Sequence, residues 1–216
     1  MPDSKNFSYE FPRPALTVDS VVFSYADKEL KVLLIKRADE PFKDRWAFPG
    51  GFVNEGETAE EAVKRELAEE TAVRDVQLEQ FWTATRPGRD PRGWTISVIF
   101  IGFTLCESLK TVAGDDAKEV AWHFVNEKPV LAFDHDELLQ KACSIIRFRF
   151  RLISLVHKLL QPAFTRDDFL RLAVALGFPE NDAMQRFQRL LRAAFIKTSD
   201  TNGVYNFDSK KLEGMN

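Results

Sequence analysis

Three glutamates at helical spacing constrain this chain more than any other feature of its sequence. Glu66, Glu69 and Glu70 stand three and four residues apart, so a helix places all three carboxylates on one face. Thr58 and Glu61 form a capping-box pattern, which predicts that this helix begins near residue 59. Carboxylates packed together repel one another unless a cation lies between them, and such oxygen ligands suit Mg²⁺ or Mn²⁺. A solvated acidic helix face is the alternative explanation of these three residues alone.

A magnesium ion held by carboxylates usually keeps water ligands and shares phosphate oxygens with a substrate. The three glutamates therefore indicate metal-assisted attack of water on a phosphoryl group. Arg65 immediately precedes the first of them, and we expect its guanidinium to pair with a carboxylate and to orient it.

The complete spacing of this segment is more specific than the glutamates. Residues 51–73 read GFVNEGETAEEAVKRELAEETAV, which resembles the Nudix box, G-x5-E-x7-R-E-U-x-E-E-x-G-U with U apolar. One position departs from the pattern, because Ala72 stands where the family usually has glycine. That glycine ends the helix and often adopts a positive φ, which costs alanine about 1 kcal/mol. We expect a slightly altered helix exit and an intact metal site.

The resemblance implies an α/β fold, specifically an α/β/α sandwich with a mixed sheet. It also implies hydrolysis of the pyrophosphate bond in a nucleoside diphosphate linked to a second group. Glu66 and Glu70 correspond to the main metal ligands, Glu69 to a ligand or to the base that activates water, and Glu57 to a residue that supports a second metal or the water network. The implied metal ligands are Glu66, Glu69, Glu70 and the carbonyl of Gly51, and the implied catalytic residues are Glu57, Arg65 and Glu69.

Hydrophobic periodicity around the box agrees with such a fold. Strands are expected at residues 16–25, 30–37, 76–85, 95–104 and 118–125, and helices at 59–71 and 134–147. The first two strands are separated by a short turn, which predicts a hairpin. A turn-forming loop rich in glycine, proline and arginine occupies residues 86–93.

Further segments resemble the ADP-ribose-handling Nudix group, which implies ADP-ribose or a related nucleoside diphosphate sugar as the substrate. They lie at residues 11–19, 42–52, 89–94, 113–117 and 131–139. The candidate substrate-binding residues are Arg37, Arg86, Arg92 and Trp82, with Trp94 as an alternative base-stacking residue. Core packing is the alternative role for each aromatic residue, and a solvated charge is the alternative for each arginine. Asp115 and Asp116 are candidates for a mobile base or a ribose contact, or belong to a plain turn.

Charge divides the chain into two parts. Residues 1–140 carry a net charge of −9 and residues 141–216 a net charge of +6. After about residue 149 the pattern is three helical segments followed by a short hairpin with its turn at Asn202-Gly203. This order resembles the winged helix-turn-helix module of Nudix-related transcriptional regulators. We therefore expect a Nudix domain at residues 1–148 and a small winged helix-turn-helix domain at residues 149–216.

The helix expected at residues 180–195 corresponds to the recognition helix of such a module. Arginines spaced by three residues along it can reach phosphates and guanine edges in the major groove of double-stranded DNA. The candidate DNA-binding residues are Arg186, Arg189, Arg192 and Lys197. A basic, solvated helix that only packs on its neighbour is the alternative. Regulators of this type bind two half-sites, so a homodimer is expected.

Two main functions follow from the sequence. The first is a Mg²⁺-dependent (or Mn²⁺-dependent) hydrolase of ADP-ribose-like substrates with an accessory module. The second is a transcriptional regulator that senses ADP-ribose or a sugar nucleotide, with slow or absent hydrolysis. A third possibility is a hydrolase whose C-terminal module only dimerises the protein. We expect a cytoplasmic protein without a membrane span, because no apolar run approaches about 20 residues and the two cysteines are interpreted as buried, reduced thiols.

Overall fold

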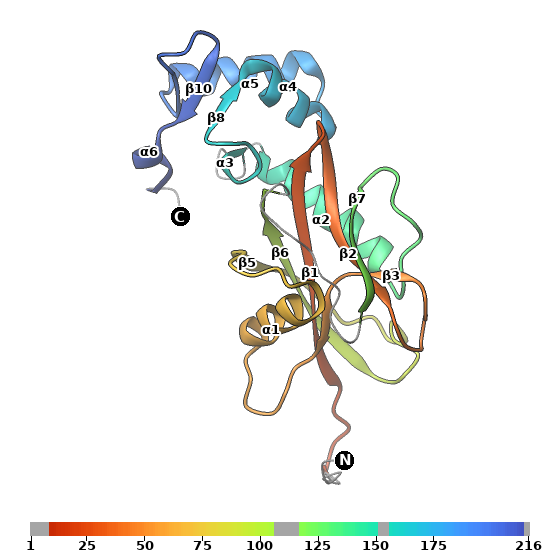
Figure 1. Ribbon diagram of the computed structural model, residues 1–216. Helices are drawn as coiled ribbons and strands as arrows, with labels where there is room; N and C mark the ends of the chain where they lie inside the picture. Colours follow the sequence, from red (N-terminus) through yellow and green to blue (C-terminus); the bar gives the residue numbers. More distant parts are fainter. Residues whose placement is uncertain (1–8, 106–116, 151–155, 214–216) are drawn as a thin grey trace.

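The computed structural model describes residues 9–105, 117–150 and 156–213, and Figure 1 shows the path of the chain. Asp115, Asp116 and Cys106 lie outside these residues. Cys143 is described and is a free thiol that is only half-buried. Across the described ranges, no helix combines the length and the apolar character needed to cross a membrane.

A mixed sheet forms the N-terminal part of the protein. Its strands are β1 (Ala15–Ala26), β2 (Glu29–Arg37), β3 (Trp46–Ala47), β4 (Gly50–Phe52), β5 (Leu78–Ala84), β6 (Thr95–Phe103) and β7 (Ala117–Phe124). The strand order is β3-β2-β1-β6-β5, with β4 paired to β1 and β7 paired to β2. The β1–β2 hairpin is antiparallel, whereas β1 and β6 run parallel. The five longer strands and the hairpin expected from periodicity are therefore confirmed.

Two helices, α1 (Ala59–Thr71) and α2 (His135–Phe150), cover the two faces of this sheet, on either side of β1 and β2 in Figure 1. Alternation along β1 sends successive side chains to opposite faces. Val21 packs in the cluster that contains Leu138 of α2, and Val22 packs in the cluster that contains Leu67 of α1. The fold is the predicted α/β/α sandwich.

Helix α1 begins where the capping box predicted. The Thr58 side chain accepts from the backbone N–H of Glu61, and the Glu61 carboxylate accepts from the backbone N–H of Thr58. The helix ends at Ala72, which itself adopts the left-handed conformation, with φ 60° and ψ 5°. The helix exit is therefore not altered, since alanine takes the strained conformation that glycine adopts without strain. The glutamate face remains helical.

The C-terminal part has the order and the pairing of a winged helix. Its elements are α3 (Val156–Leu159), β8 (Ala163–Thr165), α4 (Arg166–Ala175), α5 (Glu180–Arg192), β9 (Ile196–Thr198), β10 (Val204–Phe207) and α6 (Ser209–Glu213). The three short strands form a second sheet in the order β8-β10-β9. The hairpin expected around Asn202-Gly203 is confirmed, and Gly203 has the positive φ of 78° that a tight turn favours.

The two parts share one apolar cluster that continues from the sheet into the winged helix. Phe150, the last residue of α2, is fully buried and lies 5.7 Å from the ring of Phe169 and 5.0 Å from that of Phe178. The Nε of Arg147 donates to the carbonyl of Leu176 at 2.9 Å. Helix α2 thus crosses the domain boundary expected near residue 148, and this boundary stays a prediction.

Candidate functional site

Arg65 lies at the centre of the carboxylates on α1. Its guanidinium makes a two-pronged contact with Glu57, with Nε 2.7 Å and Nη2 2.9 Å from the two carboxylate oxygens. Its Nη1 reaches Glu66 at 2.8 Å and Glu69 at 3.1 Å. The hydrogen bonds from Arg65 are the largest cause that holds the pKa of Glu57 down at about 2. Arg65 therefore contacts three of the four box carboxylates, whereas the sequence predicted a pairing with one of them.

Gly50 and Gly51 of β4, called here the glycine segment, lie directly against the other side of this face. Glu70 is buried, and its Oε2 accepts from the backbone N–H of Gly50 at 2.8 Å. A Cβ at Gly51 would stand 2.3 Å from Oε1 of Glu66, so only glycine allows the carboxylate this close to the chain. The donors brought together here are carboxylate and backbone oxygens, the set that Mg²⁺ and Mn²⁺ prefer. The residues present fit such an ion.

The carboxylates of the box do not all converge on one metal position, however. Within the described ranges, no three Asp, Glu, His or Cys side chains are gathered closely enough to hold a metal ion among themselves. The side chain of Glu69 is 61% exposed and turned toward Arg65, whereas those of Glu66 and Glu70 adjoin the glycine segment. The geometry thus separates Glu69 from the two residues that correspond to the main metal ligands.

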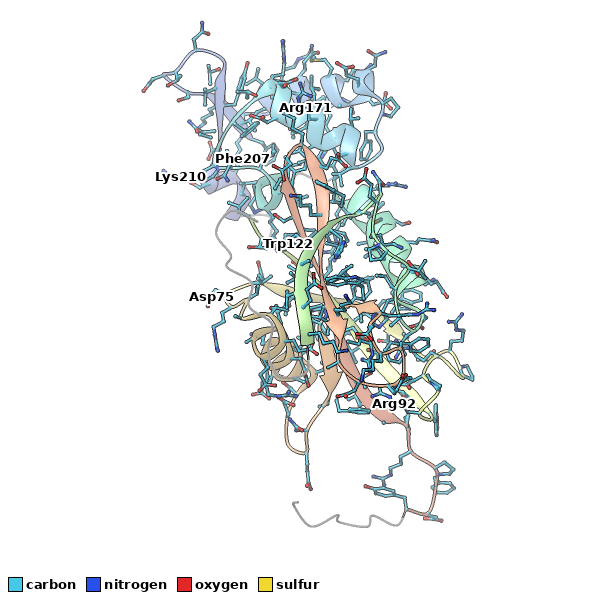
Figure 2. All side chains as sticks on the ribbon, turned by 45° about the vertical axis from the view of Figure 1, so that its right-hand side comes forward. Asp75, Arg92, Trp122, Arg171, Phe207 and Lys210 are labelled. Atoms are coloured by element: carbon cyan, nitrogen blue, oxygen red, sulfur yellow. The ribbon has the colours of Figure 1, made fainter. Side chains whose placement is uncertain are left out.

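An open cleft of about 320 Å³ begins at Glu66 and Glu70. Arg37 and Arg92 line it together, and Figure 2 shows Arg92 near the lower end of the sheet, far from Arg171 and Phe207 of the winged helix. The Arg92 guanidinium lies 5.0 Å from the ring centre of Phe52. Burial, and next the positive charge of Arg92, lower the pKa of Arg37 from its ordinary value. The two guanidiniums offer charged donors to an anion in the same cleft that presents the carboxylates of Glu66 and Glu70.

A smaller and deeper cavity of about 40 Å³ adjoins this cleft and shares Arg37, Arg92 and the glycines with it. It is lined by polar residues that the sequence did not single out. Arg89 is buried and forms a two-pronged ion pair with Asp134, at 3.1 and 2.8 Å. Asp19 and His135 are also buried there. One signal for Asp19 was available, since it is a charged residue inside the apolar run LTVDSVVF.

Two predicted substrate residues lie elsewhere. The Arg86 side chain is 60% exposed and pairs with Glu137 at 3.2 Å, outside both cavities. Trp82 lies on β5, is 44% exposed, and has the Lys141 ammonium 4.7 Å from its ring centre. Trp94 is 53% exposed and lines neither cavity. The structure therefore brings Arg37 and Arg92 to the box but not these three side chains.

The candidate DNA-binding residues also divide into two groups. Arg189 and Arg192 are exposed on α5, on the side that carries Gln185 and Gln188. Arg186 turns inward instead, and its guanidinium lies 5.4 Å from the ring centre of Phe150. Lys197, on β9, is exposed and paired with Asp208.

The NUDIX domain model matches residues 14–142 of the chain, which contain α1, the glycine segment and both cavities. The chain belongs to the Nudix family. Among its Nudix relatives, an ADP-ribose pyrophosphatase of Methanocaldococcus jannaschii is 46% identical over 127 residues, which are 59% of this chain and 72% of the relative. The ADPR responsive transcriptional repressor NtrR of Acinetobacter baylyi is 29% identical over 201 residues, 90% of this chain and 79% of the repressor.

A solved structure extends this similarity across both parts of the molecule. Shewanella oneidensis NrtR, complexed with a 27mer DNA, superposes with a TM-score of 0.70 at 29% identity. The match covers 92% of this chain and 95% of the NrtR chain. The Nudix sheet followed by a winged helix is thus an architecture shared with a DNA-bound protein.

Proposed function

We propose that this Nudix protein hydrolyses the pyrophosphate bond of ADP-ribose or a related nucleoside diphosphate sugar with the help of a divalent cation such as Mg²⁺. The main observation behind this proposal is that the Arg65-bound carboxylates and the glycine segment adjoin a cleft that is lined by Arg37 and Arg92. The ADP-ribose pyrophosphatase relative, at 46% identity, supports ADP-ribose as the substrate. In the reaction, water adds across the phosphorus–oxygen bond and yields AMP and ribose 5-phosphate.

In this proposal Glu66, Glu70 and the carbonyl of Gly51 hold the cation, which when bound acts as a Lewis acid toward the phosphate oxygens. Arg65 fixes the carboxylates of Glu66 and Glu57, so that no repulsion opens the face. Glu69 is the exposed carboxylate of the cluster, and we assign it the role of accepting the proton of the attacking water.

The cleft supplies the contacts for the diphosphate. Arg37 is held in place by its own loop, because its Nε donates to the carbonyl of Pro41 at 2.8 Å. Arg92 is fixed by Asp90, with Nη2 2.7 Å from the carboxylate. Guanidiniums positioned in advance bind phosphate oxygens with little loss of side-chain entropy. The two arginines thus orient the pyrophosphate bond toward Glu66 and Glu70.

The test is incubation of the full chain with ADP-ribose and Mg²⁺, with AMP and ribose 5-phosphate separated by chromatography. Glu70→Gln keeps the shape of the side chain but removes the charge, and we expect a loss of activity on the order of 10²–10³-fold. Glu60→Gln, at an exposed position of the same helix, is the matched control and should retain wild-type activity. A wild-type chain that is folded but releases no nucleoside monophosphate from ADP-ribose or from a panel of nucleotide sugars would refute the proposal.

A second function, DNA-binding transcriptional regulation with ADP-ribose as the effector, is favoured by the exposed face of α5. The NrtR structure with a 27mer DNA and the ADPR responsive repressor support it. We propose that Arg189 and Arg192 contact DNA directly, with Lys197 beside them, whereas Arg186 supports the helix from within. Because a regulator whose effector is its own substrate clears the signal, the two functions are compatible.

Fluorescence anisotropy with a duplex from upstream of the gene, with and without ADP-ribose, tests the second function. Arg189→Ala should weaken binding by about 1–3 kcal/mol, and the matched control Arg74→Ala, in the exposed loop after α1, should not. Absence of binding at low salt would count against DNA recognition. We also propose a homodimer that acts in the cytoplasm, because two half-sites require two winged helices. Light scattering during gel filtration measures this directly.

A further inference from the structure

A series of buried polar side chains lies beneath the glycine segment of the Nudix site. His135, the first residue of α2, is 3% exposed, and its Nδ1 accepts from the backbone N–H of Phe48 at 3.0 Å. Since Nδ1 accepts, the proton of the neutral ring stands on Nε2. That nitrogen lies 3.5 Å from Oδ1 of Asp19. Burial is the largest cause that lowers the pKa of His135 below its ordinary value.

Asp19 continues this series into the sheet. It is 8% exposed on β1, and its Oδ2 accepts from the hydroxyl of Ser97 on β6 at 2.5 Å. Its Oδ1 lies directly under the glycine segment, because a Cβ at Gly50 would stand 2.9 Å from that oxygen. Ser97 and the sheet thus fix the carboxylate of Asp19, and this carboxylate faces the protonated nitrogen of the His135 ring.

The contacts of His135 and Asp19 fall on residues 48–50, which lead into the glycine segment of the Nudix site. Phe48 is followed by Pro49, whose carbonyl accepts from the backbone N–H of Ser20 at 2.8 Å and from its hydroxyl at 3.1 Å. The next residue, Gly50, donates its N–H to Glu70. The backbone is therefore held at three successive residues, and His135 provides the hold at the first of them. The Phe48 ring also stacks on the His135 ring at 4.7 Å and 12°.

We propose that His135, oriented by Asp19, is a positioning residue for Nudix hydrolysis. It fixes the position of the glycine segment and thereby the positions of the Glu66 and Glu70 carboxylates. This inference rests on the proposed hydrolase function. A shift of about 1 Å in a group that positions reacting atoms can cost about 10²-fold in rate. Removing the acceptor also leaves the Phe48 N–H buried without a partner, which favours a displaced segment.

Two substitutions separate positioning from mere packing. His135→Asn keeps an acceptor at the place of Nδ1 but loses the ring, whereas His135→Phe keeps the ring and its stacking but loses the acceptor. We expect kcat for ADP-ribose to fall about 10²-fold in the Phe variant, with KM changed less than about threefold, and to recover to within about tenfold of wild type in the Asn variant. The matched control His157→Phe replaces a half-buried histidine of α3 and should keep wild-type kinetics.

A readout independent of turnover is the affinity for Mn²⁺, measured by calorimetry on the same full-length proteins. The Phe variant should bind Mn²⁺ about tenfold more weakly than the Asn variant. Equal losses in both variants, in parallel with their melting temperatures, would indicate a structural role and overturn the proposal. If wild type shows no hydrolysis, the proposed function fails, and the Mn²⁺ affinities still decide the role of His135. If the Phe variant does not fold, Asp19→Asn applies, with an expected loss of about tenfold in kcat.

Discussion

Ala72 allows an energetic test of the structure, because replacing it by glycine removes a single Cβ atom from a residue in a strained backbone conformation. It occupies the left-handed region at φ 60° and its side chain is exposed, so a substitution there changes little besides backbone strain. The left-handed conformation costs a non-glycine residue about 1–2 kcal/mol. Glycine avoids this strain but loses about 0.5–1 kcal/mol more conformational entropy on folding. Ala72→Gly should therefore stabilise the protein by about 0.5–1 kcal/mol.

Thermal and denaturant unfolding of the full chain measure this difference. For a chain of this size, the gain corresponds to a rise of about 1–4 °C in melting temperature. The matched control is Ala68→Gly, the same change one turn earlier, where the helix is regular and glycine costs about 1 kcal/mol. The two substitutions should thus shift the stability in opposite directions. A destabilised Ala72→Gly variant, or equal shifts for both, would refute the assignment of strain at the helix exit.

Three other predictions follow from buried or charged groups. Phe150→Ala should lower the free energy of unfolding by about 3–5 kcal/mol, because the ring is fully buried, whereas Phe148→Ala, at a 66% exposed position, should cost little; chemical denaturation distinguishes them. Arg92→Ala should raise the dissociation constant for ADP-ribose about tenfold or more in calorimetry, while Arg86→Ala, outside the cleft, should leave it nearly unchanged. Burial first of all lowers the pKa of His135, so the unfolded chain binds a proton more readily and stability is lost as pH falls below about 6.5. His135→Asn should remove this part of the pH dependence, and parallel melting curves for the variant and wild type between about pH 5 and pH 8 would contradict it.

Local patterns predicted the elements whose signals are local. Runs rich in Val, Leu and Phe marked the strands around residues 16–37, and the capping box of Thr58 and Glu61 marked the start of α1. The box spacing also predicted that Arg65 pairs with a carboxylate, since one helical turn joins it to Glu69. In each case the deciding contact lies within a few residues in sequence, where helix and strand geometry leave few alternatives.

Contacts between distant segments were not predictable in the same way. The ion pair of Arg89 with Asp134 joins residues 45 positions apart, and no periodicity signals it. For Arg186 the reason is geometric, because a three-residue step on an α-helix falls about 60° short of a full turn. Over the two steps to Arg192 the direction changes by about 120°, so Arg186 faces Phe150 while Arg192 faces solvent. The spacing grouped three arginines that the fold divides.

Helix α2 joins the two proposed functions physically, and this joint can be tested. Its first residue, His135, lines the deeper cavity, and its last residue, Phe150, is buried in the winged helix. The 16 residues span about 24 Å as one stiff rod, so a shift at one end is carried to the other. For α2 to act as the link, ADP-ribose must bind one position of this helix more tightly than another. DNA must then alter the affinity for ADP-ribose by the same factor as ADP-ribose alters the affinity for DNA. Phe150→Leu keeps an apolar side chain but removes the ring beneath Arg186. We expect both factors to shrink together in this variant while hydrolysis stays at the wild-type rate, and a variant that retains the full mutual effect would exclude α2 as the link.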